Sequence, residues 1–184
     1  MKCTITLALA LMFTMTFSQP TMAQPMPNIS AQQEAMAALS FMVGTWEGDG
    51  EMRRGPEVQF SQVLEKVTMK LDGTALLIEG LGTYQSEENG EVITAHEAIG
   101  LIWYDATEGS YRMKALTPGR ETDADFELTE TGIKWGFSTP GGEVRYSAEY
   151  TEDSWLETGT FSRDGETWMP FFSMNLQRVD TPDE

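Results

Sequence analysis

Between residues 44 and 180 apolar and polar residues alternate with a period of two, the pattern of β-strands with one face on a core and one in solvent. Turn-forming pairs such as Asp72-Gly73 and Asp164-Gly165 separate the segments and supply the positive φ of tight hairpins. The predicted strands span 45–54, 57–71, 74–85, 91–104, 110–117, 121–129, 132–138, 143–151, 154–163 and 167–179. Strands joined by short turns predict an antiparallel meander, and closure into a barrel would remove its exposed edges.

One helix is predicted before the strands. Ser30 can cap its start, with Gln33 completing a capping box, and Met36 and Leu39 give it an apolar stripe. Gly44 is expected to end it. The expected fold class is therefore all-β, a ten-stranded antiparallel up-and-down barrel with one short N-terminal helix.

The alternation also assigns inner faces. In 132–138 the inward residues are Ile133, Trp135 and Phe137. In 91–104 the apolar phase contains Ile99 and Leu101, and it would turn Glu97 into the barrel and His96 out of it. The inward phase of 57–71 and 74–85 stays undecided, because both faces of the second segment begin apolar.

The N-terminus has the pattern of a secretory signal peptide. A lysine precedes an uncharged apolar run over 5–17 and a small-residue site, which places cleavage near Ala23. The run is too short to span a bilayer, so no integral membrane anchor is expected. The chain then divides into a signal peptide (1–23), a mobile lead with the helix start (24–35) and a lipocalin-like barrel domain (36–180), and the protein is expected to be periplasmic or secreted.

Charge and composition narrow the partners. The chain has 12 Lys and Arg against 29 Asp and Glu, a net charge of −17, which disfavours nucleic acid. Cleavage would remove Cys3 and leave His96 as the single His, so no metal site is expected. No Gly-x-Ser-x-Gly motif or phosphate-binding loop occurs, and no cofactor is required.

The triplet Gly44-Thr45-Trp46, together with Arg178 near the end of the last strand, resembles the start and end of calycin barrels such as lipocalins and fatty-acid-binding proteins. The resemblance implies a structural role: Trp46 closes one barrel end under the Arg178 guanidinium, with Gly44 beside them. The stretches "VGTWEGDGEM", "KLDGTALLIEGLGTY", "HEAIGLIWYD" and "FSRDGETWMPFFSMNLQRV" resemble an exported bacterial family of unknown function, numbered fifteen seventy-nine, over nearly all of 36–179.

That family is similar to nitrobindin, a haem-binding barrel that shares the "GTWxGxG" opening. A nitrobindin-type site implies a His ligand near the C-terminal end of the barrel. No His lies in 154–184, and His96 falls in the fourth strand, so haem binding of this kind is disfavoured.

The aromatic interior indicates a cavity for a small hydrophobic or amphipathic molecule. Carboxylates and an arginine would orient its polar end, and aromatic and Met side chains would line the rest. The expected ligand-binding residues are Glu97, Glu79, Arg112, Trp103, Trp135, Phe126, Phe172 and Met174. An ion pair of Glu97 with Arg112 or Lys114 would instead be structural. An enzyme acting within the cavity and a filled barrel with a structural role are the alternatives, and the oligomeric state is open.

Overall fold

The computed structural model describes residues 29–179, so the expected signal peptide and its cleavage site near Ala23 lie outside the described residues. A helix α1 (Ser30–Ala37) and a 3-10 turn η1 (Ser40–Met42) precede ten strands. The strands are β1 (Gly44–Arg54), β2 (Glu57–Lys70), β3 (Ala75–Gln85), β4 (Val92–Asp105), β5 (Ser110–Thr117), β6 (Arg120–Leu128), β7 (Gly132–Thr139), β8 (Gly142–Tyr150), β9 (Ser154–Ser162) and β10 (Met169–Val179).

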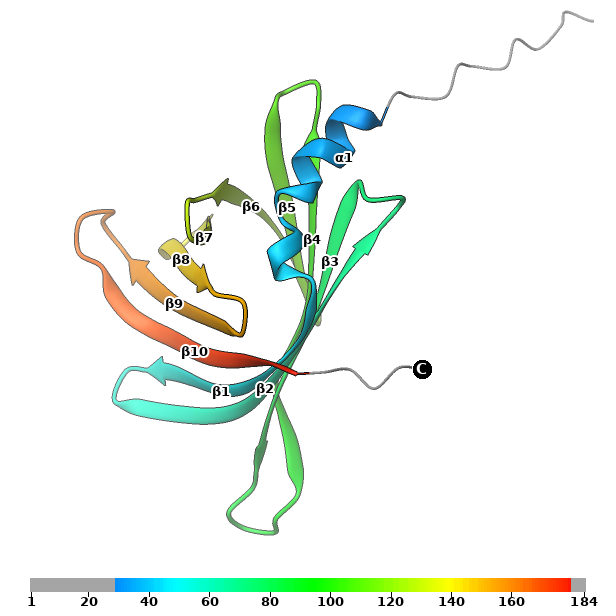
Figure 1. The fold of residues 1–184 in the computed structure, drawn as a ribbon. Helices are drawn as coiled ribbons and strands as arrows, with labels where there is room; N and C mark the ends of the chain where they lie inside the picture. The colour runs from blue at the N-terminus through cyan, green and yellow to red at the C-terminus, as the bar shows by residue number, and fades with distance from the viewer. Residues whose placement is uncertain (1–28, 180–184) are drawn as a thin grey trace, which may run out of the picture.

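The strands form one closed antiparallel barrel (Figure 1). Each strand pairs with its neighbours in the chain, and β1 pairs with β10 to close the ring. This confirms the predicted fold class. Asp72-Gly73 and Asp164-Gly165 lie in turns as predicted, with Gly73 at φ +81° and Gly165 at φ +76°.

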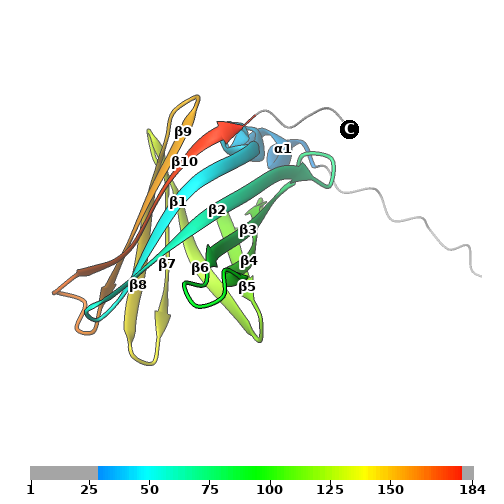
Figure 2. The ribbon, with the colours of Figure 1, turned by 90° about the horizontal axis from the view of Figure 1, so that it is seen from below.

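Helix α1 lies across one end of the barrel, the end at which β10 finishes (Figure 2). Met36, Leu39 and Met42 are fully buried there. The Tyr111 hydroxyl on β5 donates to the Ala35 carbonyl at 2.8 Å and ties the helix to the sheet. The N-terminal segment therefore plugs this end of the barrel with apolar side chains.

The start of the helix differs from the expected capping box. The cap position is Ile29, and no side chain caps the helix from there. The Gln33 amide donates instead to the Asp72 carbonyl in the β2–β3 turn, at 2.7 Å. The Gln33 side chain therefore makes a tertiary hydrogen bond to the β2–β3 turn and not the local bond of a capping box.

Arg178 closes the same barrel end from β10. Its guanidinium carbon lies 4.0 Å from the centroid of the Trp46 ring, within cation–π range. It also donates to the carbonyls of Val43, Phe41 and Glu152. Gly44 has φ +145°, and a Cβ there would collide with the Arg178 guanidinium. These contacts join the first strand, the last strand and the helix segment.

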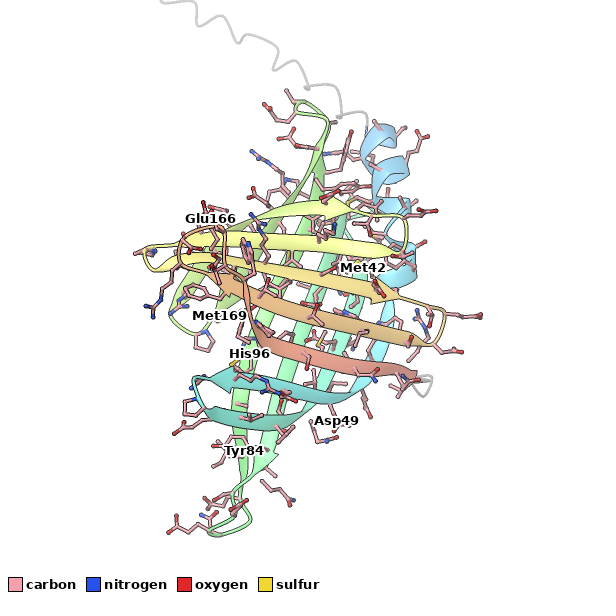
Figure 3. All side chains as sticks on the ribbon, turned by 90° about the vertical axis from the view of Figure 1, so that its left-hand side faces the viewer. Met42, Asp49, Tyr84, His96, Glu166 and Met169 are labelled. Atoms are coloured by element: carbon pink, nitrogen blue, oxygen red, sulfur yellow. The ribbon has the colours of Figure 1, made fainter. Side chains whose placement is uncertain are left out.

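The inward phase is now defined for β2 and β3: Val63, Glu65 and Val67 face inward on β2, and Leu76, Ile78 and Gly80 on β3. Figure 3 draws the side chains on both faces of the barrel strands and labels His96 of β4 among them.

The expected phase of β4 is wrong over its second half. Gly82 pairs with His96 but Thr83 pairs with Thr94, so Ala95 is an extra residue that shifts the register. Beyond this bulge His96 and Gly100 line the interior and Ile102 is fully buried, whereas Leu101 is 37% exposed. The outer face of β4 carries the larger apolar side chains, which can pack against side chains of the neighbouring strand. Leu101, for example, lies opposite Leu77 of β3.

Candidate functional site

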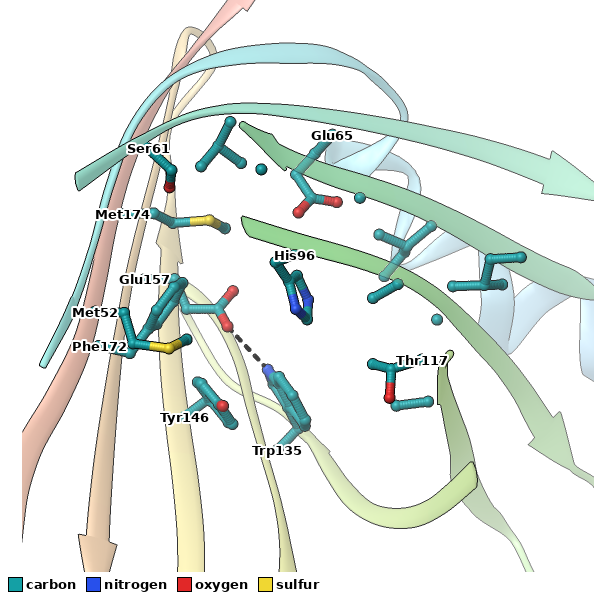
Figure 4. Close-up of a pocket in the computed structure, with 18 of the residues that line it drawn as sticks. Met52, Ser61, Glu65, His96, Thr117, Trp135, Tyr146, Glu157, Phe172 and Met174 are labelled. Atoms are coloured by element: carbon teal, nitrogen blue, oxygen red, sulfur yellow. Dashed lines mark hydrogen bonds between the residues drawn. The ribbon is translucent and has the colours of Figure 1, made fainter. Parts of the chain in front are cut away.

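The interior of the barrel contains a cavity of about 290 Å³ that is partly open to solvent (Figure 4). Small residues on β3 and β4, among them Gly80, Gly82 and Ala98, leave room on one side. The opposite side carries larger apolar and aromatic groups. They include Met52, Ile133, Trp135, Phe137, Phe172 and Met174. Side chains therefore do not fill the barrel, and the space has mainly apolar walls.

Glu157 is a buried carboxylate in this apolar surrounding. It is 5% exposed and projects from β9. The indole Nε1 of Trp135 donates to its Oε1, and that of Trp155 donates to its Oε2, each at 3.1 Å. Burial raises the pKa of Glu157 to about 7, and the indole hydrogen bonds act in the opposite direction by stabilising the charged form.

Glu65 is a second carboxylate of the cavity, supplied by β2. It lies opposite Gly80 of β3, and its carboxylate occupies the space beside that glycine where a Cβ would stand. Burial, with repulsion from Glu157, raises the pKa of Glu65 to about 8. Figure 4 shows both carboxylates pointing into the cavity from different walls.

Other ionisable groups surround the two carboxylates. His96 lines the cavity from β4, and burial lowers its pKa, so the neutral imidazole is favoured. Burial and repulsion from Glu157 raise the pKa of Tyr146, and burial and repulsion from Glu157 and Glu65 raise that of Tyr150. The Tyr150 hydroxyl is buried without a hydrogen-bond partner in the described chain. The polar part of the cavity therefore combines acidic groups with neutral ones.

An aromatic cluster forms one wall. The rings of Trp135 and Tyr146 stack with centroids 4.0 Å apart and planes 8° from parallel. Phe172 meets Tyr146 edge-on at 5.7 Å. The stacking and the bond to Glu157 fix the Trp135 ring between neighbouring groups, which makes this wall a pre-formed surface.

Three residues expected to contact a ligand, Trp135, Phe172 and Met174, do line the cavity. Two others lie elsewhere. Phe126 packs edge-on against Tyr111 at 5.6 Å. Trp103 shares the outer phase of β4 with Leu101, because the bulge reverses that phase.

The polar residues proposed from the sequence lie outside the cavity. Glu97, Glu79 and Arg112 are exposed, and none lines it. For Glu97 the reason is the bulge at Ala95, which turns His96 inward in its place. Glu79 points outward because Ile78 and Gly80 take the inner face of β3.

Glu65 and Glu157 are not among the ligand-binding residues predicted from the sequence. The inward position of Glu157 could have been predicted, because it follows Trp155 by two residues on one strand and the two side chains therefore share a face. The inward position of Glu65 could not have been predicted, because β2 presents apolar residues on both faces, with Leu64 outside and Val63 inside.

Within residues 29–179 no group of three or more His, Cys, Asp or Glu side chains is arranged to hold a metal ion. Over the same residues, no helix has the length and hydropathy to cross a membrane.

No protein family model matches the chain, and no curated protein sequence matches it. Solved structures do. Rv2717c from M. tuberculosis aligns with a TM-score of 0.57 at 12% identity, over 79% of this chain and 98% of that one. The S-type phycobiliprotein lyase CPES from Guillardia theta aligns with a TM-score of 0.53 at 13% identity, over 82% and 93%. With the closed ten-stranded barrel, these likenesses support a calycin- or lipocalin-like fold.

Proposed function

We propose that the chain is an exported small-molecule-binding barrel for an apolar or amphipathic ligand. The observation that carries the proposal is the cavity of about 290 Å³, whose apolar and aromatic walls surround buried polar groups. Ligand pockets have this composition: apolar area supplies the driving force and a few polar groups fix orientation. The similarity to calycin-like barrels agrees with it.

Export is proposed from the N-terminal sequence, which has the charge and apolar run of a signal peptide. The resemblance to the exported family numbered fifteen seventy-nine is consistent with it. Mass spectrometry of the protein recovered from outside the inner membrane tests this part. A chain that starts at Gln24 is expected, and an uncleaved Met1 would contradict it.

The binding function is tested with N-phenyl-1-naphthylamine, a neutral apolar probe whose fluorescence rises in apolar surroundings. Ala115 lines the cavity, and its neighbour Leu116 is 39% exposed on the outer face. Ala115→Phe should fill part of the cavity and raise the probe's Kd at least about tenfold through lost apolar contact. Leu116→Phe adds an aromatic ring outside the barrel and should leave the Kd unchanged.

Saturable binding that Ala115→Phe weakens and Leu116→Phe leaves unchanged supports a ligand-binding cavity. Failure of the native protein to bind the probe would contradict the proposal and favour a barrel with a structural role. The probe is recovered afterwards and its mass measured. An unchanged mass is expected, and chemical conversion of the probe would point to an enzyme instead.

A further inference from the structure

Of the Asp, Glu, Lys and Arg side chains that line the cavity, most are acidic. Glu65 and Glu157 lie along it on β2 and β9, and Glu51 contributes from β1. The one basic side chain of Lys or Arg type among the described lining residues is Arg120, an exposed residue at the start of β6. No salt bridge of the described chain involves Glu65 or Glu157.

Both carboxylates keep unused acceptor capacity toward the cavity. Glu157 accepts two hydrogen bonds, both from neutral indoles. Glu65 accepts none from the side chains and backbone of residues 29–179. A carboxylate can accept about four hydrogen bonds. A ligand group that donates hydrogen bonds and carries positive charge would fill the acceptor positions that the protein leaves without a donor.

The wall beside Glu157 suits such a group. Trp135 donates its N–H to Glu157, so its ring lies next to the carboxylate, and Tyr146 stacks on that ring. Met174, Met52 and Phe172 supply apolar surface nearby (Figure 4).

We infer that the ligand is an organic cation, an amphipathic amine whose ammonium group binds Glu65 and Glu157 and whose apolar part lies along the Met and aromatic wall. This inference rests on the proposed function and names its ligand class. An anionic amphiphile such as a fatty acid meets two acidic groups there, and a neutral alcohol gains no ion pair.

Proton exchange should accompany binding. The pKa of Glu65 is about 8 and that of Glu157 about 7, so in the empty cavity both hold protons for much of the time at neutral pH. A bound ammonium favours the charged carboxylates and expels those protons. The neighbouring groups compete little: His96 has its pKa lowered, and Tyr146 and Tyr150 have theirs raised, so all three stay neutral. Arg120 and Glu51 face the cavity as well, with opposite charges.

The experiment is calorimetric titration of the protein at pH 8 with octylamine, octan-1-ol and octanoate, which share one chain length and differ in head group. Octylamine should bind at least about tenfold more tightly than octan-1-ol, the ratio for one modest charge-assisted contact. Octanoate should bind most weakly. Titration in two buffers of different ionisation enthalpy should reveal release of about one proton per octylamine at pH 7 and none for octan-1-ol.

Glu65→Gln and Glu157→Gln should each bring the octylamine and octan-1-ol affinities to within about threefold of one another, because each removes one charge. The matched control is Glu97→Gln, which removes an exposed carboxylate on the outer face and should leave the preference intact. If Glu157→Gln loses its cooperative thermal transition, Glu65→Gln decides the matter, since Glu65 has no protein donor to lose.

Equal affinity for the amine and the alcohol, or an amine preference that survives Glu65→Gln, overturns the inference. Binding of N-phenyl-1-naphthylamine distinguishes a wrong ligand class from a wrong binding function. If the neutral probe binds and the amine is not preferred, only the ligand class is wrong. If neither binds, the proposed function fails with it.

Discussion

The carboxylate of Glu65 lies against Gly80, its direct partner on the neighbouring strand, in the space that a Cβ at position 80 would fill. Because Gly80 has no side chain, the carboxyl group of Glu65 has room at this position in the cavity. The atoms that an added Cβ would meet are the end of the flexible Glu65 side chain, 2.6–2.9 Å away, and these atoms can move.

Gly80→Ala should consequently displace the Glu65 carboxylate while the barrel still folds. We expect octylamine affinity to fall by about tenfold, the loss of one ion contact. The thermal midpoint should change little, because alanine also lowers the entropy of the unfolded chain by an amount worth about 0.4–1 kcal/mol.

Gly82→Ala is the matched control. Gly82 also lines the cavity from β3, but a Cβ there would meet its nearest atoms at ordinary distances of 3.6 Å or more. It should leave octylamine affinity within about twofold. Equal losses in the two variants would mean that space in the cavity, and not the place of Glu65, controls binding.

The raised carboxyl pKa values make stability depend on pH. Glu65 and Glu157 have folded pKa values of about 8 and 7 against an ordinary value of 4.5, so the folded state binds their protons more tightly than the unfolded state. Their contribution is therefore fully present below pH 4.5 and is lost as pH rises through about 7 and 8. We expect the free energy of unfolding to fall between pH 5 and 8.5 by several kcal/mol, at about 1.4 kcal/mol per pKa unit for each carboxyl group.

Urea denaturation across this range measures the effect. The variant with both Glu65→Gln and Glu157→Gln should have a markedly flatter profile, because neither amide titrates. If the double variant retains the slope of the native protein, the effect comes from the general acidic charge and not from the cavity.

At the closed end of the barrel, Arg178 should contribute more to stability than its contact with the Trp46 ring alone would. Arg178 donates to three backbone carbonyls besides lying over the ring. Arg178→Lys keeps the charge and loses the planar fork, so we expect a loss of about 2–4 kcal/mol in the free energy of unfolding.

Arg145→Lys provides the comparison. Arg145 also lies over a tryptophan ring, 3.9 Å from that of Trp168, but it is exposed and its side chain donates to Glu143. Its replacement should cost less than about 1 kcal/mol, the range for an exposed pair. Similar losses at both positions would show that the carbonyl contacts of Arg178 contribute little.

The fold was predictable because its signals are local. The turn pairs such as Asp72-Gly73 mark strand ends, and the alternation in β7 places Trp135 inward as expected. The side chains that β4 presents to the cavity were not predictable, because their phase depends on one extra residue. The bulge at Ala95 reverses the phase of β4, and no sequence signal marks it.

The size of the inward residues is a second reason why the inward phase of β4 was predicted wrongly. A cavity requires small inner residues, here Ala98 and Gly100, so the larger Leu101 lies outside at 37% exposure. A rule that turns the most apolar phase inward is valid for a filled core and fails beside a cavity.

A crystal structure of the protein grown with octylamine would locate the ammonium group directly. We expect the alkyl chain along Met174 and Phe172, with the amine nitrogen about 2.7–2.9 Å from carboxylate oxygens of Glu65 and Glu157. An amine bound at the exposed outer carboxylates Glu79 and Glu97, or a cavity closed by rearranged side chains with no amine in it, would contradict amine binding by Glu65 and Glu157.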